Sequence, residues 1–217
     1  MGDLTGSMHW SVALAIAYLV GSIPTAYLAG RLLKGVDLRT IGSGNLGATN
    51  VYRNLGAAPA VIVLLLDAAK GALPVLYLPK QIHGVWFFES REMVLWGLGC
   101  GIAAIAGHAK PIFLLWKGGG KGVSTAAGVF GALAPAAFGI ALVVFITVTF
   151  ASGIVSAASI AAAVVLPIAV ALTIGLKSAI FYAALLVALF VVWSHRANIA
   201  RLRAGTEPRT FGKKEGA

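Results

Sequence analysis

Long apolar runs separated by short polar connections make up most of this chain of 217 residues. Several runs reach or approach the ~20 residues that an α-helix needs to cross a hydrocarbon layer about 30 Å thick. The pattern therefore predicts an all-α integral membrane protein, with residues 1–217 forming a single polytopic domain. The apolar segments fall at about 9–30, 57–78, 93–115, 123–134, 136–151, 154–175 and 178–194.

These segments predict about seven transmembrane helices of uneven length. Segment 123–134 is too short for an ordinary span, and the Ala134-Pro135 step separates it from the next segment. The alternative is a half-helix at 123–134, which leaves six full spans. Within the first segment, small residues surround Pro24, and this predicts close helix packing with a kink.

The composition agrees with a membrane location. Hydrophobic residues make up 59% of the chain and charged residues 11%, against about 25% charged residues in a soluble domain. The net charge of +10 would suggest nucleic acid in a soluble protein, but basic loops beside a membrane account for it, so we expect no nucleic-acid partner. The single cysteine, Cys100, lies in an apolar run, so we expect a packing residue and no cysteine-rich metal site.

Basic residues are distributed unevenly between the two sets of connections, which predicts the orientation of the chain. The positive-inside rule places the side with more lysine and arginine in the cytoplasm. We therefore expect the N-terminus outside and the C-terminus in the cytoplasm, and an odd number of spans agrees with this. Only Lys80, Arg91 and Lys177 lie on the opposite side. The thirteen basic residues of the cytoplasmic side are Arg31, Lys34, Arg39, Arg53, Lys110, Lys117, Lys121, Arg196, Arg201, Arg203, Arg209, Lys213 and Lys214.

The connection after the first segment is rich in glycine and in neutral hydrogen-bonding side chains. It reads IGSGNLGATNVYR over residues 41–53. Its glycines permit positive φ and a close approach of the backbone, so successive N–H groups can point at one anion. The alternative is a solvated loop followed by a capped helix start. The candidate anion-binding residues are Ser43, Gly44, Asn45, Gly47, Thr49, Asn50 and Arg53.

A second glycine-rich connection, WKGGGKGVST over residues 116–125, stands where a helix is about to begin. A glycine loop at a helix N-terminus offers free N–H groups and a positive dipole end to a phosphate, and Lys121 adds a point charge. Gly119 and Gly120 are the candidate backbone contacts. The pattern does not fit a Walker A loop, because Lys121 is followed by Gly122 instead of serine or threonine. The alternative is a flexible basic turn at the lipid headgroups.

The third polar cluster follows the last apolar segment, as HRANIARLRAGTE over residues 195–207. If the helix continues, His195, Asn198 and Arg201 recur every three residues and share an arc of roughly 120°. Leu202 falls in the same arc. Such a face can bind an anionic substrate, and the alternative is a basic anchor at the membrane surface.

Asp67 and Lys70 lie inside the second apolar run, where an isolated charge is costly and usually faces the protein interior. Their spacing of three residues permits an ion pair on one helix face. Structural pairing and direct substrate contact both remain open for them. His108, near the end of the third segment, is either an acid or base, or a hydrogen-bonded structural residue.

Taken in order, these motifs resemble the bacterial membrane acyl-phosphate:glycerol-3-phosphate acyltransferases, the PlsY family. The match runs from Gly21 to Glu207 through GSIPTAYLAG, GSGNLGATNVYRNLG, DAAKG, GHAKPIF, KGGGKGVST and HRANIARLRAGTE. The resemblance implies a seven-helix fold in the bacterial plasma (inner) membrane with a cytoplasmic site. It also implies transfer of a fatty acyl group from acyl phosphate to the 1-hydroxyl of glycerol 3-phosphate. The products are lysophosphatidic acid and phosphate, and neither a metal nor a cofactor is implied.

The chain departs from the family pattern at three places. KGGGKG replaces the usual KGGKG, Lys110 replaces an aromatic residue, and the turn at 152–156 lacks a basic residue and a tyrosine. With these departures noted, the resemblance implies two sets of site residues. The catalytic set is Ser43, Lys121, His195 and Asn198. The substrate-binding set is Gly44, Asn45, Gly47, Thr49, Asn50, Arg53, Gly119, Gly120, Arg201, Ser156 and Ser159.

The chemistry of an acyl phosphate is consistent with these residues. Its carboxyl group is already activated, so the protein mainly positions two anions and stabilises developing charge. We expect the first glycine loop and Lys121 to hold the acyl phosphate, and Arg53, His195, Asn198 and Arg201 to hold glycerol 3-phosphate. The motifs offer no obvious carboxylate base. By resemblance, an oxygen of the donor phosphate accepts the hydroxyl proton.

Two other protein classes fit the sequence less well. Another class of glycerolipid acyltransferases uses an HxxxxD pattern, and none of the four histidines here has an aspartate five residues later. A membrane transporter of an organic phosphate is the other alternative, since basic, glycine-rich sites at helix breaks also serve transport. Its usual inverted repeat is not evident, and all the phosphate-like motifs are predicted on one side.

The predicted orientation can be tested by thiol labelling after native Cys100 is replaced by serine. We expect a cysteine near Ser43, Lys117 or Arg203 to be shielded from impermeant reagents in intact cells and labelled after permeabilisation. A cysteine near Lys80 should react from outside, because of the asymmetry in basic residues. Labelling near Ser43 and Arg203 in intact cells would invert the orientation. Labelling near Lys117 alone would instead place the error in the spans around 123–134.

Overall fold

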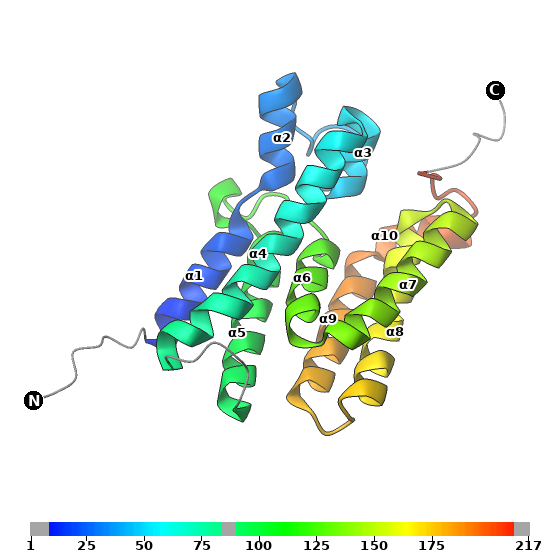
Figure 1. Ribbon diagram of the computed structural model, residues 1–217. Helices are drawn as coiled ribbons and strands as arrows, with labels where there is room; N and C mark the ends of the chain where they lie inside the picture. Colours follow the sequence, from blue (N-terminus) through cyan, green and yellow to red (C-terminus); the bar gives the residue numbers. More distant parts are fainter. Residues whose placement is uncertain (1–8, 84–89, 211–217) are drawn as a thin grey trace, which may run out of the picture.

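The computed structural model describes residues 9–83 and 90–210, and every regular element in these ranges is a helix. The predicted all-α class is confirmed (Figure 1). Lys213 and Lys214, which contribute to the charge asymmetry, lie outside the described residues. The elements are α1 (Trp10–Ser22), α2 (Thr25–Lys34), α3 (Ala48–Leu55), α4 (Ala57–His83), α5 (Arg91–Ala109), the 3₁₀ helix η1 (Ile112–Leu114), α6 (Val123–Leu133), α7 (Pro135–Ser152), α8 (Val155–Thr173), α9 (Ala179–Ser194) and α10 (Arg196–Arg203).

Five helical segments of the described residues are long and apolar enough to cross a membrane. They are Trp10–Lys34, Ala57–Gln81, Arg91–Leu114, Pro135–Ser152 and Val155–Thr173. The pair α9 and α10 makes a sixth if it is taken as one bent span. Helix α6 has 11 residues, so it is only about 17 Å long and does not reach across a ~30 Å hydrocarbon layer by itself. This matches the half-helix alternative for segment 123–134.

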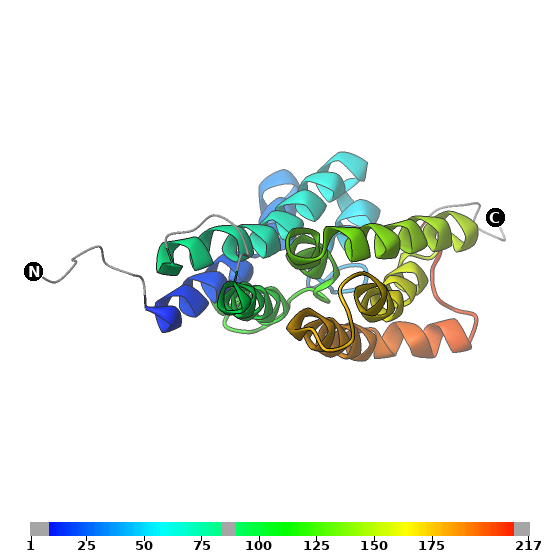
Figure 2. The same ribbon diagram turned by 60° about the horizontal axis from the view of Figure 1, so that its bottom comes forward.

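The long helices form two groups with α6 between them. Helices α1, α4 and α5 pack against one another, and α8 packs against both α7 and α9. Helix α6 packs mainly on α4 and also contacts α5, α7 and α9 (Figures 1 and 2). Helices α2, α3 and α10 lie at the same end of this bundle, and α1 begins near the opposite end (Figure 1). The polar segments are therefore gathered at one end.

Small residues allow α6 to lie close to α4. A Cβ added at Gly128 would overlap the backbone of Ala68, and one added at Gly71 would overlap the carbonyl of Thr125. Larger side chains at these glycines would push the two helices apart. The close packing places the start of α6 next to the middle of α4, where the buried charges lie.

The predicted kink at Pro24 is confirmed, because α1 ends at Ser22 and α2 begins at Thr25. At this break the carbonyl of Ile23 accepts hydrogen bonds from Thr25 N and from Lys70 Nζ, each at 3.0 Å. Lys70 also forms a 2.7 Å ion pair with Asp67, and these two side chains are only 6% and 1% exposed. Structural pairing of the two charges is therefore confirmed. Removing one partner of such a buried pair typically costs about 3–5 kcal/mol.

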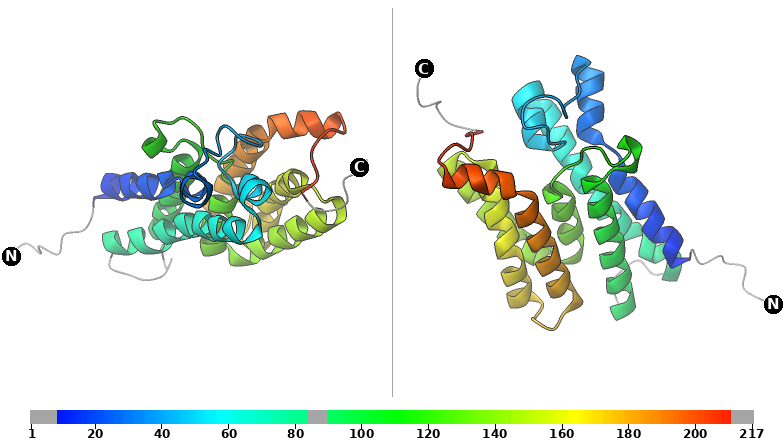
Figure 3. Two further views of the ribbon diagram at one scale, coloured as in Figure 1. Left: turned by 90° about the horizontal axis from the view of Figure 1, so that it is seen from above. Right: turned by 180° about the vertical axis from the view of Figure 1, so that it is seen from behind.

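The last helical segment bends by 59° between α9 and α10. Figure 3, right, shows α10 leaving the axis of α9 at the polar end of the bundle. The predicted helical continuation is therefore present, but its direction changes at His195. This bend turns the polar face of α10 towards the N-terminal ends of the neighbouring helices.

Candidate active site

A cavity of about 130 Å³ lies where the polar segments meet. Its walls come from the loop before α3, α3, α4, the end of α5, the loop before α6, the start of α6, α7, the start of α8, the bend between α9 and α10, α10 and the chain after α10. The lining residues are Ser43, Asn45, Gly47, Ala48, Thr49, Asn50, Arg53, Leu64, His108, Lys121, Val123, Ser124, Phe145, Val155, Ser156, Ser159, His195, Asn198, Arg201 and Glu207. All three polar motifs predicted from the sequence therefore share one site.

Two hydrogen bonds join the two glycine-rich loops at one carbonyl. Leu46 N and Asn45 Nδ2 both donate to Gly119 O, each at 3.2 Å. In the first loop, Asn50 Oδ1 accepts from Ser43 N at 3.1 Å, and Asn50 Nδ2 donates to Leu38 O at 3.0 Å. The buried amide of Asn50 thus shapes this loop from inside. These bonds hold together the two loops that bring Ser43 and Lys121 to the cavity.

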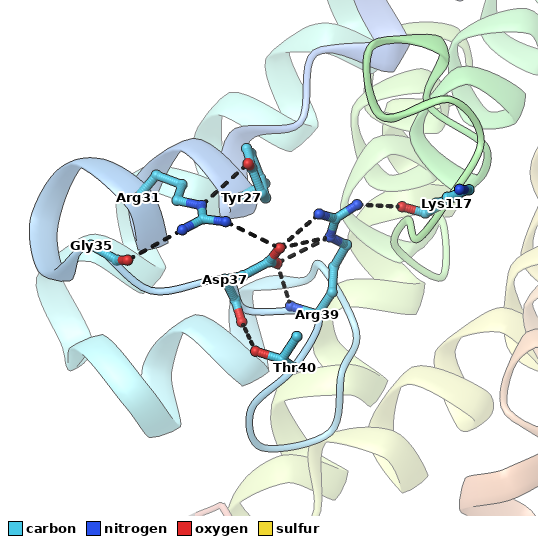
Figure 4. Close-up of polar contacts among 7 residues, drawn as sticks. All are labelled: Tyr27, Arg31, Gly35, Asp37, Arg39, Thr40 and Lys117. Carbon is cyan, nitrogen blue, oxygen red and sulfur yellow. Dashed lines mark hydrogen bonds and ion pairs between the residues drawn. The ribbon is translucent and has the colours of Figure 1, made fainter.

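A surface ion-pair cluster holds the same two loops from outside (Figure 4). The Arg39 guanidinium forms a 2.7 Å ion pair with Asp37, lies over the Tyr27 ring and donates to Lys117 O at 3.1 Å. Arg31 also pairs with Asp37, at 3.5 Å. The hydrogen bonds from Arg39 hold the pKa of Asp37 at about 2, so this carboxylate stays charged throughout the physiological range.

The segment before the second glycine loop is anchored to α1. The Trp116 indole donates to Tyr18 Oη, and Tyr18 Oη donates to Lys110 O, both at 2.8 Å. Leu115 and Trp116 have φ of 51° and 58°, a left-handed conformation that is uncommon for residues with a Cβ. Such backbone strain persists where surrounding contacts fix it.

Three helix N-termini converge on the cavity. Helices α3, α6 and α8 begin at Ala48, Val123 and Val155, and all three of these residues line it. No side chain caps any of these helix starts. The first N–H groups of a helix have no acceptor within the helix, and the N-terminus carries a partial positive charge. The cavity is therefore lined by backbone donors suited to an anion.

A hydrogen-bond chain connects the second and third motifs. Lys121 Nζ donates to Asn198 Oδ1 at 2.5 Å, and Asn198 Nδ2 donates to Glu207 Oε1 at 2.5 Å. Glu207 Oε1 also accepts from Ser156 Oγ at 2.7 Å, and Glu207 Oε2 pairs with Arg201 Nε at 2.6 Å. The Glu207 carboxylate thus orients Ser156 of α8 and two residues of α10, Asn198 and Arg201. Through Asn198 it also orients Lys121.

Sequence reasoning did not select Glu207, although it ends the third motif. Glu207 is 9% exposed and faces the cavity. Burial raises its pKa, but the hydrogen bonds from Asn198, Ser156 and Arg201 outweigh this effect and hold the pKa below its usual range. In the sequence, only the position of Glu207 at the end of the third motif indicated a role in the site. Its contacts with Ser156, Asn198 and Arg201 form because the chain folds back after α10.

The cavity contains more cationic than anionic side chains. Its charged lining residues are Arg53, Lys121, Arg201 and Glu207. Glu207 already pairs with Arg201, whereas Lys121 donates to a neutral amide and Arg53 donates to Pro208 O and Thr210 Oγ1 at 3.1 and 3.2 Å. Two cations thus have neutral acceptors here. Such cations can exchange these acceptors for phosphate oxygens.

Burial lowers the pKa of Lys121 to about 8. The Glu207 charge raises this pKa, and the charges of Arg201 and Arg53 lower it further. The Lys121 ammonium is therefore charged at neutral pH. Of the two lysines in the second glycine-rich connection, Lys121 faces the cavity and Lys117 is exposed. Gly119 and Gly120 lie behind the cavity and line a smaller one beside Lys70 and His108.

His195 is 3% exposed and lines the cavity at the bend between α9 and α10. Its Nδ1 lies 2.8 Å from Val191 O. Because a carbonyl oxygen can only accept, Nδ1 carries the proton, and in the neutral ring Nε2 is left as an acceptor. His195 can thus accept a hydrogen bond from a hydroxyl group.

Most of the predicted site residues are brought together. Gly44 is the one residue of the first loop's candidate set outside the cavity lining, and its N–H bonds Ile41 O at 3.1 Å. Ser159 of the substrate-binding set lines the cavity, but its hydroxyl donates to Val155 O at 2.9 Å. His108 and Ser124 were not among the predicted site residues and also line it.

Fold and site together define a multi-pass membrane protein with a cationic, phosphate-compatible cavity at one end of its helical bundle. A family model described as glycerol-3-phosphate acyltransferase matches residues 11–205, so the chain belongs to this family. A glycerol-3-phosphate acyltransferase of Synechococcus sp. (strain CC9902) is 48% identical over 93% of this chain and 94% of its own. Another, of Macrococcus caseolyticus, is 39% identical over 95% of this chain and 100% of its own.

Solved structures support the same assignment. The crystal structure of PlsY (YgiH), an integral membrane glycerol 3-phosphate acyltransferase, in its glycerol 3-phosphate form is similar with a TM-score of 0.80 and 35% identity. It covers 94% of this chain and 96% of that chain. The lysophosphatidic acid form gives a TM-score of 0.79, 34% identity and coverage of 94% and 95%. The predicted family is therefore confirmed.

The lowered pKa of Lys121 predicts a specific pH dependence. The ammonium is present below pH 8 and lost above it, so we expect kcat/KM to fall with an apparent pKa of about 8. Replacement by arginine, whose pKa exceeds 12, should lower activity but remove this alkaline limb. Initial rates between pH 6.5 and 9.5 in detergent would measure both effects. A limb near pH 8 that persists in Lys121→Arg would assign it to another group.

Proposed function

We propose that this chain transfers a fatty acyl group from acyl phosphate to the 1-hydroxyl of glycerol 3-phosphate, giving lysophosphatidic acid and phosphate. The observation that carries the proposal is the convergence of three uncapped helix N-termini with Lys121, Arg53 and Arg201 on one cavity. Both proposed substrates carry a phosphate group. The family assignment favours this activity over transport of an organic phosphate.

Lys121 and Arg53, the two cations that donate to neutral acceptors, match the two phosphates of the reaction. Lys121 stands beside the α6 N-terminus, so we assign the donor phosphate to it and to the first glycine loop. We assign glycerol 3-phosphate to Arg53, His195, Asn198 and Arg201, which line the same cavity. Phosphate oxygens can displace the neutral acceptors of Lys121 and Arg53, because charge-assisted hydrogen bonds are stronger than neutral ones.

Apolar residues complete the cavity wall and suit an acyl chain. Leu64 of α4, Val123 of α6 and Phe145 of α7 line it together with the polar groups. Leu64 is 44% exposed on the outside of the bundle. An acyl donor could thus place its phosphate on the polar groups and its chain on the apolar surface that continues towards lipid.

The proposed reaction is a direct acyl transfer. The 1-hydroxyl oxygen attacks the acyl carbon, the bond from that carbon to the phosphate oxygen breaks, and inorganic phosphate leaves. The hydroxyl proton passes to an oxygen of the departing phosphate, so no protein base is needed. Helix N-termini and Lys121 stabilise the charge on the leaving group, and His195 Nε2 orients the attacking hydroxyl.

We further propose that the enzyme lies in the bacterial plasma membrane with this cavity facing the cytoplasm. The basic loops that form the cavity support this orientation under the positive-inside rule. Both substrates would then arrive from the compartment that the cavity faces.

A donor comparison tests the proposed function. Purified protein in detergent should convert palmitoyl phosphate and glycerol 3-phosphate to lysophosphatidic acid with one phosphate released per product. Palmitoyl-CoA and palmitoyl-acyl carrier protein should give little or no product, because they lack the acyl phosphate. Lysophosphatidic acid formed faster from a thioester than from palmitoyl phosphate would refute the proposed donor. Counterflow of glycerol 3-phosphate in proteoliposomes without any acyl product would favour the transporter.

The proposed role of His195 gives a separate prediction. His195→Ala should raise the KM for glycerol 3-phosphate by about tenfold or more, as expected for loss of one buried hydrogen bond, while leaving the shape of the pH–rate profile unchanged. Steady-state kinetics across pH would measure both. If the substitution instead removes a limb of the profile at unchanged KM, His195 is a general base and the substrate-assisted step is wrong.

A further inference from the structure

Three sequence motifs that the proposed reaction does not use meet behind the second glycine loop. They are GSIPT at the α1–α2 break, DAAKG in α4 and GHAK at the end of α5. Thr25 Oγ1 donates to Asp67 Oδ1 at 2.5 Å, Lys70 pairs with the same oxygen at 2.7 Å, and Lys70 donates to Ile23 O at 3.0 Å. The α1–α2 break thus fixes both charges of α4.

His108 connects this buried cluster to the glycine loop. Its Nδ1 lies 3.7 Å from Asp67 Oδ1, and the side chain is only 5% exposed. The His108 carbonyl accepts from Gly120 N at 3.1 Å. His108 lines both the main cavity and the smaller one, which also contains Thr25, Lys70 and Gly120. The residue therefore stands between the buried charges and the residue that precedes Lys121.

The packing of the His108 ring against Gly120 leaves no room for a side chain. A Cβ at Gly120 would overlap the ring, with Nε2 the nearest atom. A Cβ at the adjacent Gly119 would instead overlap the backbone carbonyl of Ala109. The two glycines thus face different neighbours, although they belong to the same loop. The position of the ring sets how closely Gly120 approaches α5.

We propose that His108, which faces the Asp67 carboxylate fixed by Lys70 and Thr25, is a positioning residue that sets the place of Gly120 and thereby of Lys121 in the active site. It acts on substrate through the loop. The inference rests on the proposed function, because Lys121 is taken to bind a substrate phosphate. It also gives a role to the buried charge pair, which fixes the carboxylate that His108 faces.

A double-mutant cycle tests the contact between His108 and Gly120. Gly120→Ala should lower kcat/KM about 100-fold, as expected for a displacement near 1 Å, and His108→Ala about tenfold. In the double variant the methyl group has room, so its activity should exceed the additive expectation by about tenfold or more. Additive losses in the double variant would overturn the proposal.

Gly119→Ala is the matched control for this cycle. It also impairs the loop, but His108→Ala should not rescue it, since the Ala109 carbonyl remains. Rescue of Gly119→Ala to the same degree would show a general loosening of the loop and refute the specific contact. Gly139→Ala, at a position with open space around it, should leave activity unchanged.

A kinetic comparison separates positioning from a merely structural role. His108→Ala should raise the KM of the same phosphate substrate whose KM rises in Lys121→Met. A lower melting temperature with both KM values and kcat unchanged would make His108 only structural. If His108→Ala does not fold, His108→Asn retains a polar group facing Asp67 and serves in both experiments. If the wild-type protein is inactive with palmitoyl phosphate, the proposed function itself is wrong. If the wild type is active but the losses in the double-mutant cycle are additive, only this inference is wrong.

Discussion

The convergence of three uncapped helix N-termini on one cavity is the constraint on which the rest of this structure depends. Partial positive charges close together repel one another, and unsatisfied N–H groups in a membrane protein are costly. The arrangement is therefore stable only where water, polar side chains or an anionic ligand can satisfy those donors. Glycine-rich loops before α3 and α6 allow the chain to reach these helix starts without side chains filling the space. Binding of phosphate would satisfy the donors, so affinity for anionic substrates follows from the same geometry.

A buried charge pair in the membrane-spanning part supports the glycine loops on the side away from the cavity. Asp67 and Lys70 form a buried ion pair, and Lys70 also donates to the Ile23 carbonyl at the Pro24 break. At the protein surface, the Asp37–Arg39 ion pair precedes the first glycine loop, and Arg39 donates to the carbonyl of Lys117 before the second. The two loops are thus supported on opposite sides by charge pairs. Rigid support of this kind is what a mechanism based on positioning two anions requires.

Sequence patterns predicted the helical class, the break at Pro24, the short segment at 123–134 and the three polar motifs of the site. They did so because apolar length, proline and glycine act locally. The hydrogen bond between Asn45 and Gly119 could not be predicted, because it depends on how packing against α4 places α3 and α6. The role of Glu207 was missed for a related reason. Its contacts with Ser156, Asn198 and Arg201 require the chain to return after the bend at His195.

The surroundings of Glu207 also bear on how the hydroxyl proton leaves. This carboxylate is the only acidic side chain among the cavity-lining residues of the described chain, so it is the first candidate for a protein base. Its two oxygens already accept from Asn198, Ser156 and Arg201, and its pKa is held below the usual range. A weakly basic, fully hydrogen-bonded carboxylate is a poor proton acceptor, and protonating it would weaken the contacts that orient Asn198 and, through it, Lys121. The departing phosphate becomes more basic as its bond to carbon breaks. Transfer of the proton to that phosphate therefore keeps the site intact during each turnover, whereas transfer to Glu207 would disturb it.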